Sequence, residues 1–308
     1  MTRNSQPEIS RRPILHWWFG LSRPWQRAVP LGALLTCIFL VGIVAPGLTP
    51  QDPFKVSIRD RLKPPGYVSE SGAVFLLGTD GVGRDVLSRV ILGSQMSLLI
   101  AVSAVLIAAV LGSCIGLVTG FVRGKIETIV MRLADIWLAF PEILLALSIT
   151  AVLGASVFNL IVALGLSRWV SYVRLVRGNV LAIREREFVT AAQSIGVSPL
   201  RIMFRHVLPN TVDVIVILAA LHLGQMIILE SALSFLGLGI QPPTPSWGGM
   251  IGDGRIYLHN AWWVATFPGL AIAITVLTAG LFGDALRDAL DPRFRMDGTF
   301  SWRVTPCR

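Results

Sequence analysis

The feature that most constrains the fold is the run of residues 91–122, which contains no charged side chain. A helix needs about 20 apolar residues to cross the ~30 Å hydrocarbon core of a bilayer, so this run can span it with length to spare. Further runs with few or no charges lie at residues 28–45, 212–236 and 266–282. Only 15% of the 308 residues are charged, against about 25% in soluble domains. The sequence therefore predicts an all-α protein with several transmembrane helices.

The basic residues indicate which ends of these helices face the cytoplasm. The net charge of +9 would also suit a nucleic-acid-binding protein. However, the arginines cluster beside the apolar runs, as the positive-inside bias requires, and no basic stripe is interleaved with aromatics. We therefore expect membrane lipid and no nucleic acid as a partner. Arg11-Arg12 begins no twin-arginine signal, because the apolar run comes too late and no small-residue cleavage site follows, so residues 1–27 are predicted to be a cytoplasmic tail.

The uncharged residues 143–167 test this topology. Counting them as one span would place an arginine-rich segment outside, against the positive-inside bias. A hairpin avoids this, with one span at about residues 128–153, a turn at 154–156 and a return at about 158–172. The arginines of that segment are Arg168, Arg174, Arg177, Arg184, Arg186, Arg201 and Arg205.

The hairpin places two acids in or near the membrane. Asp135 fits the inner interface, and Glu142 follows Pro141, where a kink frees backbone groups. Six spans with both termini in the cytoplasm result. The predicted division is a tail at 1–27, a first helix and outer loop at 28–90, a five-helix core at 91–290 with a cytoplasmic loop at about 174–210, and a tail at 291–308.

Residues 187–210, EFVTAAQSIGVSPLRIMFRHVLPN, form the most informative part of that loop. Gly196 supplies a turn between two short helices, because glycine accepts a positive φ. Ser198 and Pro199 suit the N-cap and first position of the second helix. Leu208-Pro209 then ends that helix or kinks it into the next span.

Ala191-Ala192, Gly196 and Leu208-Pro209 together resemble the EAA loop of ABC importer permeases. Thr190 stands where the name of the motif places Glu, while Glu187 lies where peptide-type permeases carry one. The resemblance implies that this loop docks on an ATPase subunit. The residues it implicates are Glu187, Ala191, Ala192, Gly196, Ser198, Arg201, Arg205, Leu208 and Pro209.

Further segments resemble the dipeptide, oligopeptide and nickel permeases, and in particular their C-type subunit. They are GTDGVGRDVLSRV (78–90), DIWLAFPEILLA (135–146), ILESALSFLGLG (228–239), PPTPSWG (242–248), WWVATFPG (262–269) and GDALRDALDPR (283–293). From its residues alone, segment 78–90 predicts a turn followed by an amphipathic interfacial helix. The tryptophans near residues 247–263 favour anchoring at the lipid headgroups over caging a ligand.

The resemblance implies a type I ABC importer permease fold in the bacterial inner membrane. It also implies a heterodimer with a second homologous permease, two ATP-binding subunits and an extracytoplasmic solute-binding protein. The expected substrates are dipeptides, oligopeptides or related solutes such as nickel complexes. We expect no metal or cofactor on this chain and no enzymatic activity, with ATP and Mg²⁺ on the partner ATPases. The nearest sequence to a Walker A motif, at 120–125, has the wrong Gly-Lys spacing.

Ionisable residues within the predicted spans are functional candidates by default. Glu230, His222 and Asp135 could face the transport pathway or fix helix packing, and Asp213 suits a helix start. An alternative function is an ion- or proton-driven carrier that works alone with Glu230, His222 or Asp213. The EAA-like loop favours the importer, because such a carrier has no use for it.

Gly112, Gly116 and Gly120 recur every four residues in the second predicted span. This spacing places a smooth stripe on one helix face. We expect a neighbouring helix to pack closely there.

Overall fold

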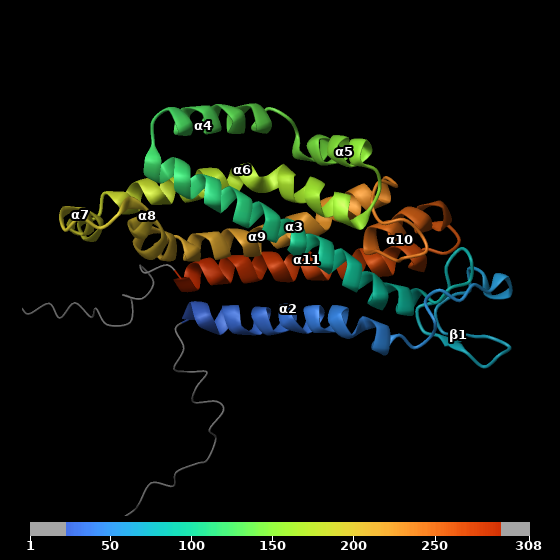
Figure 1. Cartoon of the computed structure of the whole chain (residues 1–308). Coiled ribbons are helices and arrows are strands. Elements are labelled where there is room, and N and C mark those ends of the chain that lie inside the picture. Colours follow the sequence, from blue (N-terminus) through green and yellow to red (C-terminus); the bar gives the residue numbers. More distant parts are fainter. Residues whose placement is uncertain (1–22, 291–308) are drawn as a thin grey trace, which may run out of the picture.

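The computed structural model describes residues 23–290, which are helical apart from one short hairpin and the connecting loops (Figure 1). The helices are α2 (Arg23–Leu48), α3 (Val86–Val122), α4 (Lys125–Leu138), α5 (Glu142–Leu153), α6 (Val157–Arg184), α7 (Glu187–Ser194), α8 (Pro199–Ile202), α9 (Val212–Phe235), α10 (Trp247–Gly254) and α11 (Trp263–Leu290). Strands β1 (Tyr67–Val68) and β2 (Val74–Phe75) pair antiparallel, with Tyr67 opposite Phe75. Most of the predicted tails, 1–22 and 291–308, lie outside the described residues.

Five of these helices, α2, α3, α6, α9 and α11, are long and apolar enough to cross a membrane. The pair α4 and α5 would make a sixth crossing, although its two helices are bent by 92°. The all-α fold with up to six spans is thereby confirmed.

A neighbouring helix packs closely on the glycine stripe, as predicted, and that helix is α6. A Cβ on Gly112 would be 2.4 Å from the carbonyl oxygen of Trp169, and one on Gly116 would be 2.7 Å from that of Val173. A Cβ on Gly120 would be 2.9 Å from the Cβ of Val180. Nearer the start of both helices, Gly165 of α6 meets Ala104 and Ile107 of α3. Residue numbers therefore rise in the same direction along α3 and α6.

Helices α3 and α6 therefore run parallel, so the chain between them must return from the end of α3 to the start of α6 at the opposite end. Helices α4 and α5 make this return (Figure 1). The bent pair thus completes a sixth crossing, and residues 23 and 290 lie at the same end of the bundle as α7 and α8. We call this end the docking end.

The third predicted span, about residues 128–153, consists of two helices, with the break near the predicted kink at Pro141. Helix α4 ends at Leu138, and Pro141 stands at the N-cap of α5. Proline has no N–H to donate and restricts the residue before it, so the helix breaks here. The predicted turn at 154–156 is confirmed, since Gly154 has φ +86° and the Ser156 hydroxyl accepts a hydrogen bond from the Asn159 N–H at 3.1 Å.

Two predicted boundaries also need correction. Helix α3 begins directly at Val86, with Asp85 as its N-cap accepting from the Ser88 N–H at 2.8 Å. Segment 78–90 therefore holds a turn and the start of the span, and no separate interfacial helix. Helix α6 continues to Arg184, so residues 174–184 of the predicted loop are helical. From here on, the docking loop means residues 185–211.

The predicted anchoring of the tryptophans at lipid headgroups is wrong for Trp247 and Trp263, which are buried. The Nε1–H of Trp247 donates to the carbonyl oxygen of Val90 at 2.9 Å, and that of Trp263 donates to Thr79 at 3.1 Å. The first bond joins α10 to α3, and the second joins the start of α11 to the loop before α3. Buried indole N–H groups need such partners.

Candidate functional site

The docking loop turns at Gly196, as the sequence predicts. Gly196 has φ +76°, and its N–H donates to the carbonyl oxygen of Gln193 at 3.0 Å. The Val197 N–H donates to Ala192 at 3.1 Å. This pair of bonds is the Schellman motif, which ends a helix with a residue of positive φ. Glycine accepts that conformation at no steric cost.

The second half of the docking loop begins as predicted at Ser198 and Pro199. Ser198 holds the N-cap position of α8, although its hydroxyl forms no capping hydrogen bond. The helix continues through a π-helical turn (Met203–Val207) and a 3₁₀ turn (Leu208–Asn210), and α9 then begins at Val212. Leu208 and Pro209 thus mark the predicted end of this segment.

The inner face of the docking loop is packed onto the bundle. Val189, Ala192, Ile202, Met203 and Val207 are buried in one cluster. Their neighbours in that cluster are Leu117 of α3 and Val176, Val180 and Ile183 of α6. Movement of the loop is therefore transmitted to α3 and α6, because close-packed side chains transmit strain.

The outer face of the docking loop exposes large apolar side chains. Ile195 is 81% exposed, Leu200 67% and Phe204 57%. Arg201 and Arg205 lie exposed on the same segment. An apolar patch rimmed by charge marks a protein or membrane interaction site.

The sequence prediction named Ala191, Ala192 and Gly196 on this loop as the small residues that allow close docking. Ala191 and Gly196 are exposed, whereas Ala192 faces the interior of the bundle. Glu187 is exposed in the first turn of α7. The exposed apolar residues were missed, although the spacing of Leu200 and Phe204, four apart on one helical face, could have indicated them.

The predicted intramembrane residues fall into separate groups. Glu230 is fully buried, and the hydroxyls of Ser234 and Ser231 donate to its carboxylate at 2.7 and 3.3 Å. Asp135 is half-exposed and pairs with Arg174 at 2.6 Å. Asp213 is exposed in the first turn of α9, as expected for a helix-start acid.

His222 belongs to a cluster that the sequence did not predict. Its Nε2 lies 3.5 Å from Nη1 of Arg168, which forms an ion pair with Glu142. The ring of Tyr172 meets the His222 ring edge-on, with centroids 5.2 Å apart. Glu142 of α5 is thereby tied to α6 and α9. Within the described residues, no group of three or more His, Cys, Asp or Glu side chains could hold a metal ion.

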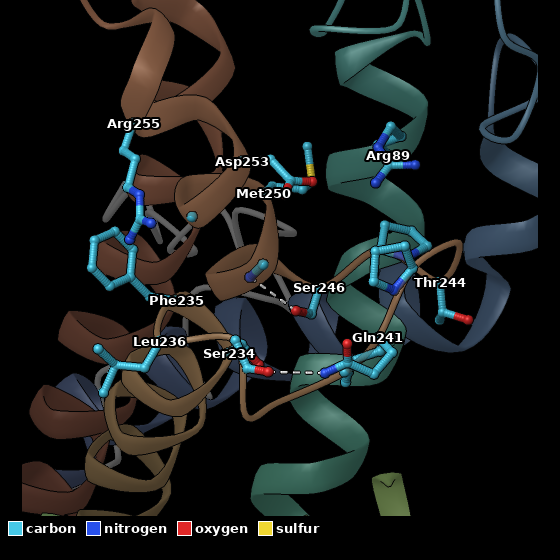
Figure 2. A pocket seen from close by; sticks show the side chains of 16 residues that line it. Arg89, Ser234, Phe235, Leu236, Gln241, Thr244, Ser246, Met250, Asp253 and Arg255 are labelled. Atoms are coloured by element: carbon cyan, nitrogen blue, oxygen red, sulfur yellow. Dashed lines mark hydrogen bonds between the residues drawn. The ribbon is translucent and has the colours of Figure 1, made fainter. Parts of the chain in front are cut away.

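A polar pocket of about 230 Å³ lies at the end opposite the docking end, and we call it the α10 pocket. Figure 2 shows Arg89 of α3 on one side and Asp253 of α10 on the other. Gln241 and Thr244 line it from the loop between α9 and α10. Its mixture of charges and amide groups suits a small polar ligand better than an apolar one.

Comparison with known proteins places the chain among bacterial transport proteins. Residues 112–296 match the family described as "Binding-protein-dependent transport system inner membrane component". The chain is 43% identical to the di/tripeptide transport system permease protein DppC of Pseudomonas aeruginosa, over 86% of this chain and 88% of that protein. It is 38% identical to the probable D,D-dipeptide transport system permease protein DdpC of Escherichia coli, over 86% and 87%. It is also 38% identical to the glutathione transport system permease protein GsiD of Pectobacterium atrosepticum, over 92% and 93%.

Proposed function

The chain belongs to the family of binding-protein-dependent transport system inner membrane components, and on that premise we propose that it carries short peptides into the cell. It is a multi-pass permease subunit of an ABC importer in the bacterial inner membrane. The ion-driven carrier considered from the sequence is therefore not retained.

The peptide substrate is supported by the relatives, whose names refer to di/tripeptides, D,D-dipeptides and glutathione. These are all short, zwitterionic or anionic amides. The sequence resemblance also allows longer peptides and nickel complexes as substrates. The relatives named here favour the short peptides.

The proposed assembly contains a second homologous permease, two ATP-binding subunits and an extracytoplasmic solute-binding protein. The family description itself names dependence on a binding protein. Since the sequence has no Walker A motif, ATP and Mg²⁺ are assigned to the partner ATPases, and this chain binds neither. The docking end, where residues 23 and 290 lie, is assigned to the cytoplasm because it holds the arginine-rich docking loop.

The observation that carries the coupling mechanism is the two-sided docking loop. Its exposed face offers Ile195, Leu200 and Phe204 to an ATPase groove, while its buried face is packed on α3 and α6. When the ATPases close on ATP, the loop moves with them and shifts the helices between inward-open and outward-open states. ATP drives this shift only because the ATPases contact the two states differently.

Co-purification from the native cells tests the proposal. The tagged chain is extracted in mild detergent and its partners are identified by mass spectrometry. We expect a second permease and ATPases with the wild type, and loss of the ATPases alone in the double variant Leu200→Glu, Phe204→Glu. The control is Ile256→Glu, a 71% exposed position near α10 at the opposite end, which should retain all partners. Purification of the chain alone, with uptake into liposomes that needs no ATP, would refute the importer assembly.

A further inference from the structure

The α10 pocket holds opposite charges on opposing sides. Arg89 is only 4% exposed yet lines the pocket, and Asp253 is exposed on α10. The two side chains interact electrostatically. They form no ion pair with each other in the described part of the chain, and both line the pocket (Figure 2).

Among the described residues, the guanidinium of Arg89 makes only long contacts with its protein partners. Its Nε lies 3.5 Å from Asp80, and its Nη1 donates a long 3.4 Å hydrogen bond to the carbonyl oxygen of Pro53. Asp80 has a shorter hydrogen bond from Arg84, whose Nε donates to it at 2.7 Å. A guanidinium carries five N–H donors in a planar fork that matches a carboxylate. Arg89 can therefore accept a carboxylate from the pocket without losing a short bond.

Polar groups elsewhere in the pocket lining suit an amide. Nε2 of Gln241 donates to the carbonyl oxygens of Gly237 and Gly239 at 3.0 and 3.2 Å, which fixes the side chain. Its Oε1 and the hydroxyl of Thr244 form no hydrogen bond within residues 23–290. An acceptor and a hydroxyl are thus left for a peptide N–H and C=O. The guanidinium of Arg255 stacks over the ring of Phe235, 5.2 Å from its centroid, and is therefore less available to a ligand than Arg89.

We propose that the α10 pocket binds the main chain of a short zwitterionic peptide, with its carboxylate at Arg89 and its ammonium group at Asp253. The volume of about 230 Å³ is smaller than that of most drug-sized sites, about 300–1,000 Å³. It therefore admits one or two residues. The peptide as ligand rests on the proposed function, and the pocket gives this permease a substrate contact of its own, separate from the binding protein.

Binding of a dipeptide and its capped forms tests this assignment. The complete complex of both permeases and the ATPases is placed in nanodiscs without binding protein. Ala-Ala, N-acetyl-Ala-Ala and Ala-Ala-amide are titrated and followed by saturation-transfer difference NMR. We expect N-acetylation to weaken wild-type binding at least about tenfold, the scale of one charge-assisted hydrogen bond.

Asp253→Asn should bind Ala-Ala and N-acetyl-Ala-Ala alike, because the acid that distinguishes them is gone. The matched control is Glu70→Gln, an acid with a 91% exposed side chain outside this pocket, which should keep the wild-type preference. Arg89→Lys keeps the charge but loses the planar fork, so it should reduce the discrimination against Ala-Ala-amide. If Arg89→Lys does not assemble, the exposed Asp253 decides the question alone.

Three outcomes would overturn the assignment. Asp253→Asn could keep the full preference for the free ammonium group. It could also keep that preference and, when binding protein is then added to the nanodiscs, lose only its affinity for that protein, which would make the pocket a binding site for a protein loop. Absence of ATP-dependent uptake by the wild-type complex with binding protein present would instead overturn the proposed function, and this inference with it.

Discussion

At the scale of single residues, Glu230 shows how an intramembrane acid can be structural. It is fully buried, and its hydrogen bonds come from Ser231 and Ser234 of its own helix and from Ser97 of α3. We expect Glu230→Gln to lower the free energy of unfolding by about 1–3 kcal/mol, because an amide cannot accept both bonds on two oxygens. Thermal unfolding in detergent measures this, with the exposed Glu187→Gln as control. Lost uptake at unchanged stability would instead place Glu230 in the pathway.

Asp60 makes the segment before β1 sensitive to acid. The Ser57 hydroxyl, at 2.7 Å, is the main cause that holds the pKa of Asp60 below its ordinary 3.8, against desolvation, with Ser69 and Tyr67 adding to it. A lowered pKa means that the stabilisation is complete above pH 3.8 and is lost as pH falls through the folded-state pKa. Pepsin cleavage near this segment should therefore rise below pH 3.8 in the wild type.

The same acid dependence should be nearly absent in Asp60→Asn, whose amide does not titrate. Asp52→Asn, in the same region, serves as control for the pH dependence of pepsin itself and should behave as the wild type. An equal rise in all three proteins would show that Asp60 does not hold the segment.

At the scale of elements, the contact between α3 and α6 depends on glycine. A Cβ on Gly116 would lie 2.7 Å from a backbone oxygen of α6, which cannot move aside cheaply. Gly116→Ala should cost about 1–3 kcal/mol of stability, as overpacking does. Gly280→Ala on α11 is the control, because its Cβ would meet nothing within 4 Å. A lower melting temperature for Gly116→Ala alone would support this packing, and equal values would contradict it.

The turn of the docking loop at Gly196 gives a prediction about transport. Gly196 has open space around it but a φ of +76°, so a side chain there is opposed by the backbone conformation alone. Gly196→Asp should abolish ATP-driven uptake while the protein remains inserted, since left-handed conformation costs a side chain roughly 1–2 kcal/mol. Gly178→Ala also enters open space, without a positive φ, and should transport normally. Normal uptake by Gly196→Asp would remove this account of coupling.

The elements also show what the sequence could predict. Uncharged runs predicted α2, α3, α9 and α11, and the glycine stripe predicted a close helix contact on α3, because each depends on local composition. The extension of α6 to Arg184 was missed, since the positive-inside bias assigned its arginines to the cytoplasmic loop. Tertiary ion pairs explain it, such as Arg177 Nε with Glu127 at 2.8 Å. The opposing charges of the α10 pocket were missed for the same reason, because Arg89 and Asp253 meet only in the folded chain.

At the scale of the whole molecule, the parallel packing of α3 and α6 decides how often the chain crosses the membrane. The chain between these helices must return across the bundle, so α4 and α5 act as one bent crossing despite their 92° angle. Six crossings then place the docking loop and both ends of the described chain on one side, and the turn at 154–156 on the other.

Cysteine labelling tests this arrangement. Ser198, Glu70 and Ala155 are exposed, and each is replaced by Cys in a variant whose natural Cys37, Cys114 and Cys307 are Ser. On intact spheroplasts, a membrane-impermeant maleimide should label Glu70→Cys and Ala155→Cys but not Ser198→Cys, which should react only after permeabilisation. If α4 and α5 formed a re-entrant loop, Ala155 would lie inside and Ser198 outside, because α6 separates them in either case, so the labelling of Ala155→Cys and Ser198→Cys would be exchanged. The chain would then cross five times, and α3 and α6 could not run parallel, so this one residue tests the packing of the bundle as well as its topology.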